Sequence, residues 1–382
     1  MSGWYDERRE ARARAYDRAQ ARLFVLRFAF LFALAAIFWL TGWSRALAEG
    51  LQAWLPYPLA WPVRTAAFVA LAVFGYEAVL FPLAVLADYS LEKAHGRLDV
   101  EFGAWLRGFI LSLLLELAIV TAGFTGLYLL LRLFPQGWWL AATGIYAALM
   151  AGLGEWGPVW LLPRVRPPLP GGDDALADEL RRVGRAAGLD ILGAAWWNFE
   201  HQEELDPVRL IGAGRRCRAV FSAAAWRELG RREQVFLAAR QMAWRRHGAA
   251  VGAAVLQTLL AAGVFWGAGR LAQRLALARG LSGAADLPAF PFLVAALFAF
   301  AALAGVVAHA VTRLGELRAD RFALRHAGGV AALQACLRHD FEREPFAVDL
   351  PVWQVALLRR MPTAAKRLAR ARQRTAPPSA PF

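Results

Sequence analysis

Six stretches of the sequence are apolar over about 20 residues or more and hold few charges. An α-helix rises 1.5 Å per residue, so about 20 apolar residues are enough to cross the ~30 Å hydrocarbon core of a bilayer. We therefore predict an all-α membrane protein with about six transmembrane helices, at residues 23–43, 66–87, 109–133, 138–162, 249–269 and 292–311.

The sequence between the fourth and fifth apolar stretches predicts a small α/β insertion. Asp173 or Asp174 is the predicted N-cap of a helix that ends at Gly188. Residues 191–198 and 208–221 have the pattern of two short strands, and residues 231–247 form a predicted helix that leads into the fifth stretch. The expected divisions of the chain are 1–22 (amphipathic, cytoplasmic), 23–163 (four transmembrane helices), 164–248 (cytoplasmic insertion), 249–313 (two transmembrane helices), 314–375 (helical) and 376–382 (disordered tail).

Basic residues predict the orientation of the chain. The sequence is 58% hydrophobic with a net charge of +14, and its lysines and arginines are concentrated in the segments that six spans place on one side. Basic loops of membrane proteins face the cytoplasm, so we expect both termini there, in a membrane of the bacterial inner (plasma) type. We expect contacts with membrane lipids and no binding of nucleic acid. Cys217 and Cys336 are isolated, which gives no indication of a disulfide or a thiolate metal site.

Three further segments share a pattern with a known family. They are residues 88–96 followed by 103–106, residues 316–323 with the spacing E-x-x-A-D, and residues 351–353 followed by 357–368. This pattern resembles the integral-membrane zinc metallopeptidases related to CAAX prenyl protease type I and to HtpX. The resemblance implies that the insertion and the C-terminal helical region are protease-like, and that Glu316 stands where the family has its third zinc ligand.

The other catalytic positions of that family are replaced in this sequence. The family carries H-E-x-x-H on a helix, in which two histidines bind zinc and the glutamate is the general base. The resemblance implies that Arg240, Gln241 and Trp244 occupy these three positions, and that Met361 stands where the family has a later histidine. Arginine stays protonated, glutamine lacks a basic oxygen, and tryptophan has only an N–H donor. We therefore expect a pseudoprotease without zinc or another cofactor, in which Trp244 fills the space of the second histidine.

The resemblance also implies what replaces the metal. Without an ion, the Glu316 carboxylate would face a neighbouring helix without a cation, which is costly for a buried charge. We predict an ion pair between Arg240 and Glu316, with Asp320 beside it. Arg245 or Arg318 is the expected nearby additional charge.

Several charged residues lie within or at the edge of the predicted spans. They are Arg27, Glu77, Glu116 and Glu155. A charged group at the centre of a bilayer costs about 2.5 kcal/mol or more, so these side chains should face protein or water. Two arrangements satisfy this requirement, namely a water-filled chamber of the kind found in the resembled family and direct pairing, for example of Arg27 with a glutamate.

Three functional hypotheses follow. The first is a pseudoprotease that binds or scaffolds a peptide or a membrane-protein partner. The second is an active zinc metalloendopeptidase with a relocated site formed by His247, His309 and Glu316. The third is transport through a polar chamber, which would require a continuous polar stripe that includes Glu77 and Glu116.

Overall fold

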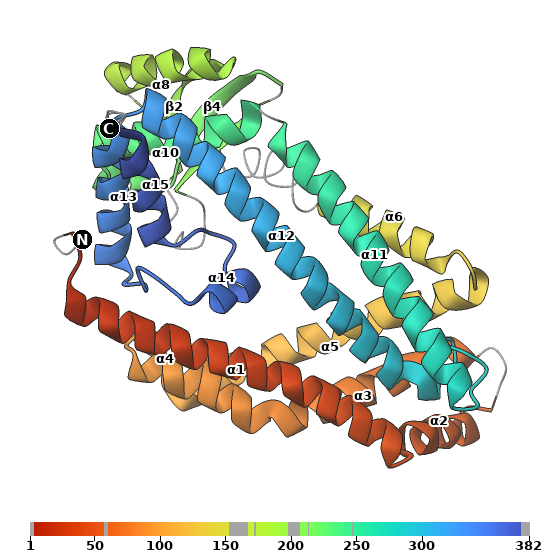
Figure 1. The fold of residues 1–382 in the computed structure, drawn as a ribbon. Helices are drawn as coiled ribbons and strands as arrows, with labels where there is room; N and C mark the ends of the chain where they lie inside the picture. The colour runs from red at the N-terminus through yellow and green to blue at the C-terminus, as the bar shows by residue number, and fades with distance from the viewer. Residues whose placement is uncertain are drawn as a thin grey trace, which may run out of the picture. The chain divides into compact units, whose positions relative to one another are not determined.

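The structure is a computed structural model that describes residues 4–56, 60–152, 167–171, 173–197, 207–212, 214–246 and 248–375. The chain forms two compact units, and several long helices contribute to both. One unit comprises Met1–Ala15, Ala147–Gln257 and Gly305–Phe382, and the other comprises Tyr16–Tyr146 and Thr258–Ala304. Figure 1 shows the order of the helices and strands along the chain.

Five helices are long and apolar enough to cross a membrane. They are α1 (Glu7–Leu40), α3 (Trp61–Ala84), α5 (Phe102–Leu133), α11 (Ala249–Ala278) and α12 (Phe290–His326). They coincide with five of the six predicted stretches, which confirms the predicted fold class of a helical membrane protein. The remaining stretch begins with the shorter helix α6 (Trp138–Met150), and its residues 153–162 lie outside the described part of the chain.

All five helices extend beyond the predicted apolar segments, and α1, α11 and α12 extend furthest. α1 begins at Glu7, so residues 7–22 continue directly into the apolar stretch instead of forming a separate segment. No glycine or proline interrupts this helix, and its straight-chain and alanine residues favour the helical state. α11 likewise continues to Ala278, beyond the predicted span 249–269, and α12 continues to His326, beyond the predicted span 292–311.

Shorter helical elements join the long ones. α2 (Trp43–Trp54) was not predicted, because its 12 residues are too few for a span. Pro82 lies inside α3 and is followed by the π-helical segment η2 (Val85–Ser90) and the short helix α4 (Leu91–Ala94). Proline removes a backbone donor from a helix, which explains a local change in hydrogen bonding at this point. The 3₁₀ segment η4 (Leu287–Ala289) precedes α12.

The unit built from residues 16–146 and 258–304 has its own apolar core. Phe68, Val69 and Tyr128 are fully buried at its centre. The outward face of α5 is apolar as well, since Leu115 and Ile119 are each more than 60% exposed. Large exposed aliphatic side chains along a long helix are expected for a surface that contacts lipid.

The insertion contains a four-stranded sheet in the order β1-β2-β4-β3. β1 (Leu169–Pro170) and β2 (Asp190–Trp196) are antiparallel, and β2 is parallel to β4 (Arg216–Phe221). The predicted strand 208–221 is a hairpin of β3 (Val208–Ile211) and β4, because Gly212 and Gly214 adopt positive φ angles of 140° and 58° between them.

Helices surround this sheet within the same unit. α8 (Asp174–Ala187) begins at the N-cap Asp173 and ends at Gly188, as predicted. α9 (Ala223–Glu228), α10 (Arg231–Arg246), α13 (Gly329–Arg343), α14 (Val352–Leu358) and α15 (Ala364–Thr375) complete the unit. Residues of α8, the sheet, α10, α13, α15 and the C-terminal part of α12 share one apolar core. This core holds α10, α12 and α15 together at the candidate site.

Candidate functional site: a buried charge network between three helices

Arg240 and Glu316 are in direct contact. Arg240 lies on α10 among the buried residues Ala239 and Ala243, and its Nη2 atom donates a hydrogen bond to Oε2 of Glu316 on α12. The side chains of Arg240 and Glu316 are only 12% and 13% exposed. Arg240, which the resemblance places at the first histidine position, and Glu316, which it places at the third ligand position, therefore meet as a nearly buried ion pair.

Asp320 extends this pair into a network. It lies one helical turn after Glu316, and residues four apart occupy the same face of a helix. Its Oδ1 atom is 2.8 Å from Nε of Arg240, although this contact lacks the direction of a hydrogen bond. Arg367 of α15 donates from Nε and Nη2 to the two carboxylate oxygens of Asp320, at 2.8 and 2.9 Å.

The network is balanced in charge, with two guanidinium groups and two carboxylates. Asp320 and Arg367 are the most deeply buried members, with side chains 5% and 7% exposed. Burial alone would lower the pKa of Arg367, but the Asp320 carboxylate raises it above its ordinary value. A buried pair of this kind adds little net stability, yet removal of one partner typically costs about 3–5 kcal/mol because an uncompensated charge remains.

Arg367 is the network member that sequence reasoning missed. It lies in a basic helix in which Lys366, Arg370 and Arg372 are exposed, so the sequence contains no sign that this arginine is buried. The expected additional charges have other roles. Arg318 is exposed. Arg245 donates to the backbone carbonyls of Leu210, Gly212 and Gly214, at 3.2, 2.6 and 3.2 Å, and so holds the β3–β4 hairpin.

Trp244 lies beside the network. Its indole ring is in contact with the backbone of α12 at Gly315, where a Cβ atom would collide with the ring. The ring also packs against the apolar core of the unit. Gln241 is partly exposed on α10, and Met361 is 45% exposed between α14 and α15. Trp244 therefore occupies space next to Glu316, whereas Met361 faces outward.

These residues do not fit a zinc ion. The family resemblance assigns a ligand role to Glu316, but its carboxylate is already bound by the Arg240 guanidinium. Within the described ranges, no group of three histidine, cysteine, aspartate or glutamate side chains converges as a metal site. The alternative site remains untested, because His247 lies outside the described residues. His309 has a buried Nδ1 atom without a hydrogen-bond partner in the described part of the chain.

The predicted intramembrane charges are partly brought together. Arg27 pairs with Asp88 at 2.7 Å, and among the described residues it forms no ion pair with Glu77 or Glu116. Glu77 lies within electrostatic range of Glu116, Arg27 and Asp88. Glu155 lies outside the described residues. The paired Arg27 thus satisfies the requirement that a charge in a span faces a partner.

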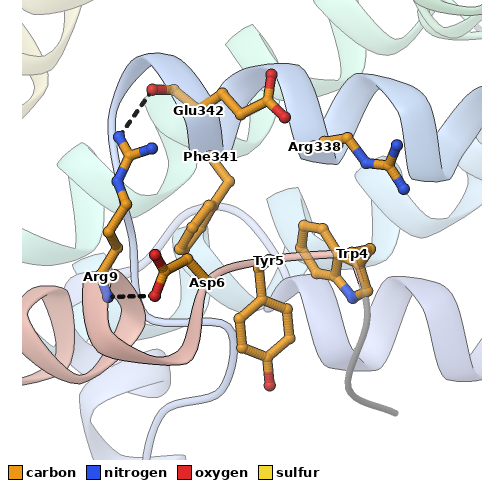
Figure 2. A pocket seen from close by; sticks show the side chains of 7 residues that line it. All are labelled: Trp4, Tyr5, Asp6, Arg9, Arg338, Phe341 and Glu342. Carbon is orange, nitrogen blue, oxygen red and sulfur yellow. Dashed lines mark hydrogen bonds between the residues drawn. The ribbon is translucent and has the colours of Figure 1, made fainter.

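A separate hollow of about 360 Å³ lies where the N-terminal segment meets α13 (Figure 2). Trp4, Tyr5 and Phe341 pack edge to face or tilted, with ring centroids 5.0–6.2 Å apart. Arg9 lies over the Phe341 ring and donates to the backbone oxygen of Glu342 at 2.9 Å. The hollow shares no lining residue with the Arg240 network, and these contacts attach residues 4–9 to α13.

Two comparisons with known proteins agree with this architecture. Residues 1–166 match the family described as CAAX prenyl protease N-terminal, five membrane helices, which is one helix more than the four that we predicted there. The structure is similar to the crystal structure of Ste24p from S. mikatae, with a TM-score of 0.71 and 15% sequence identity over 96% of this chain and 90% of that chain. No curated protein matches the sequence significantly. The chain therefore has a Ste24p-like fold, and the two findings together support the membrane metallopeptidase family of the CAAX prenyl proteases.

Proposed function

We propose that this protein is a pseudoprotease, in which the metallopeptidase fold binds a peptide or membrane-protein partner without hydrolysing it. The observation that carries the proposal is the contact between Arg240 and Glu316. Metal-assisted hydrolysis requires ligands that hold the ion and a base that activates water. At these positions the chain has a guanidinium, an amide and an indole, and its one remaining carboxylate is neutralised by arginine.

The charge network favours a structural role for these positions. Glu316 and Asp320 are matched by Arg240 and Arg367, so α10 and α12, the two helices that a metal would connect, are already joined by ion pairs, and α15 is joined to them as well. In this proposal no metal or other cofactor is needed to hold α10 against α12. The fold then supplies a rigid binding scaffold, and the partner is a peptide or a membrane protein.

Elemental analysis of the detergent-purified protein is the direct test. We expect less than stoichiometric zinc and no chelator-sensitive cleavage of peptides, together with saturable peptide binding in lipid nanodiscs. Stoichiometric zinc that disappears in Glu316→Ala, accompanied by cleavage, would overturn the proposal. The triple variant Arg240→His, Gln241→Glu, Trp244→His is the positive control for metal binding, since it supplies the missing ligands and base beside Glu316.

We also propose six crossings with both termini in the cytoplasm. Support comes from one unit, in which Val348 N donates to Glu10 Oε1 and Arg9 contacts Phe341. These contacts join residues before the first span to residues after the last, so the chain crosses an even number of times between them. Five long helices then require one more crossing, for which the stretch 138–162 is the candidate. This proposal therefore places four crossings in residues 1–166, one fewer than the matching family has. Accessibility tags at residues 2 and 380 should both report the cytoplasm, and opposite locations would refute this topology.

A further inference from the structure

One exposed face of α12 changes from apolar to basic along its length. Val307, Val311 and Leu314 are 46%, 45% and 54% exposed. Their spacing of four and three residues places them on a single stripe of the helix. We take these exposed apolar side chains as the lipid-facing part of α12, because the helix is long and apolar enough to span a bilayer and large aliphatic side chains on its surface suit contact with lipid.

Three arginines continue the same stripe. Arg318, Arg321 and Arg325 follow Leu314 at intervals of four, three and four residues, and all three are exposed. In the described part of the chain, none of their guanidinium groups has a hydrogen-bond or ion-pair partner. They differ in this respect from Arg181 on α8, which is paired with Asp178.

The depth of these arginines follows from helix geometry. The apolar stretch 292–311 is 20 residues long, which matches a ~30 Å hydrocarbon core. At 1.5 Å per residue, the Cα atoms of Arg318, Arg321 and Arg325 lie roughly 10, 15 and 21 Å beyond Val311. The headgroup layer adds about 5–7 Å on each side of the core. Side chains of a helix point back toward its N-terminus, which here is toward the bilayer.

We propose that Arg318, Arg321 and Arg325 form a binding face for the phosphate headgroups of anionic phospholipids. The side chain of Arg318 reaches the headgroup layer, and that of Arg321 reaches its outer edge. The side chain of Arg325 stays about one Debye length from the headgroups and attracts them only through the solvent. Arginine is suited to this ligand because its planar group donates two hydrogen bonds to a phosphate. The continuity of the stripe with the lipid-facing residues of the same helix favours lipid over a soluble acidic partner.

The test is a titration of phosphatidylglycerol into the full-length protein in a nonionic detergent, with bound lipid counted by native mass spectrometry. Each basic residue near an anionic surface is worth about a fivefold change in affinity. We expect Arg318→Gln to weaken binding of the tightest lipid about fivefold and Arg325→Gln to have the smallest effect. The triple variant Arg318→Gln, Arg321→Gln, Arg325→Gln should bind the lipid up to about a hundredfold more weakly. The corresponding triple lysine variant should retain most of the binding.

Two comparisons make the result decisive. Arg181→Gln with Arg182→Gln removes two exposed arginines that pair within α8, so it should leave phosphatidylglycerol binding unchanged. Phosphatidylcholine should be retained equally by the wild type and the triple glutamine variant. The proposal would be refuted if the wild type and the triple glutamine variant also retained phosphatidylglycerol equally. The proposal would also be wrong if the triple glutamine variant kept its phosphatidylglycerol but lost binding to a polyglutamate peptide, because the arginines would then bind a soluble acidic partner.

Discussion

The indole ring of Trp244 on α10 lies against the backbone of α12 at Gly315, so that even a methyl group at position 315 would collide with it. Gly315 directly precedes Glu316, the residue that Arg240 binds from the same side. The missing side chain at position 315 is therefore what allows the two helices to approach closely enough for the charge network to form.

We expect Gly315→Ala to destabilise the protein. Alanine is favoured over glycine within a helix by about 0.5–1 kcal/mol, but overpacking against a rigid ring typically costs about 1–3 kcal/mol. The thermal midpoint should therefore fall. In the Trp244→Ala background the collision is absent, so the same glycine substitution should be neutral or stabilising. A stabilising Gly315→Ala in the wild-type background would contradict the close contact.

Arg240 and Glu316 should show strong energetic coupling. Arg240→Ala leaves two carboxylates with one guanidinium, and we expect a loss of about 3–5 kcal/mol. Glu316→Ala should cost a similar amount, while the double variant should cost clearly less than the sum of the two. A double-mutant cycle on thermal or denaturant unfolding measures this coupling.

A surface pair is the matched control for that cycle. Arg181 and Asp178 form an exposed i,i+3 pair on α8. Such pairs contribute about 0.2–0.5 kcal/mol, so the corresponding cycle should give a coupling near zero. Additive losses at Arg240 and Glu316 would show that the buried contact has no energetic role.

Arg245 should be required for the β3–β4 hairpin. Its three hydrogen bonds to the carbonyls of Leu210, Gly212 and Gly214 come from different nitrogens of one planar group. Lysine has a single compact ammonium group and cannot reproduce this fork. We expect both Arg245→Ala and Arg245→Lys to increase amide hydrogen exchange in residues 208–221, with little difference between them. Normal protection in either variant would contradict this role.

Asp173 should stabilise α8 in a pH-dependent manner. Its Oδ1 atom accepts the backbone N–H of Leu176 at 3.0 Å, and this hydrogen bond, helped by Arg231, lowers the pKa of the carboxyl in the folded state. The contribution is therefore fully present above the unfolded pKa of about 4, and it is lost as the pH falls through the lower folded value.

We expect Asp173→Ala to cost about 1 kcal/mol near neutral pH, as is typical for loss of an N-cap. The difference in thermal midpoint between this variant and the wild type should shrink as the pH falls below about 4. Asp173→Asn keeps a capping oxygen and should lose much less. A difference between the wild type and Asp173→Ala that does not change with pH would argue against an ionised cap.

The helical framework could be predicted from the sequence because it depends on local properties. Apolar stretches of sufficient length predict spans, and Asp173 and Gly188 mark the ends of α8 through their own backbone preferences. The extension of α1 back to Glu7 and the division of residues 208–221 into a hairpin were missed. Neither can be read from the apolar pattern. Polar residues continue a helix wherever no glycine or proline ends it, and the position of the turn at residues 212–214 depends on how β3 pairs with β4.

The chemical content of the candidate site was determined by the sequence alone. A guanidinium, an amide and an indole at positions 240, 241 and 244 supply neither the imidazole ligands nor the carboxylate base of a catalytic zinc site in any fold. Only the tertiary structure decided which charges neutralise one another. Arg367 joins Asp320 although 47 residues separate them, whereas Arg245 binds backbone carbonyls and Arg318 faces outward. The physical reason is that a residue type fixes which partners are possible, while the packing of α10, α12 and α15 around one apolar core fixes the distances at which charges attract.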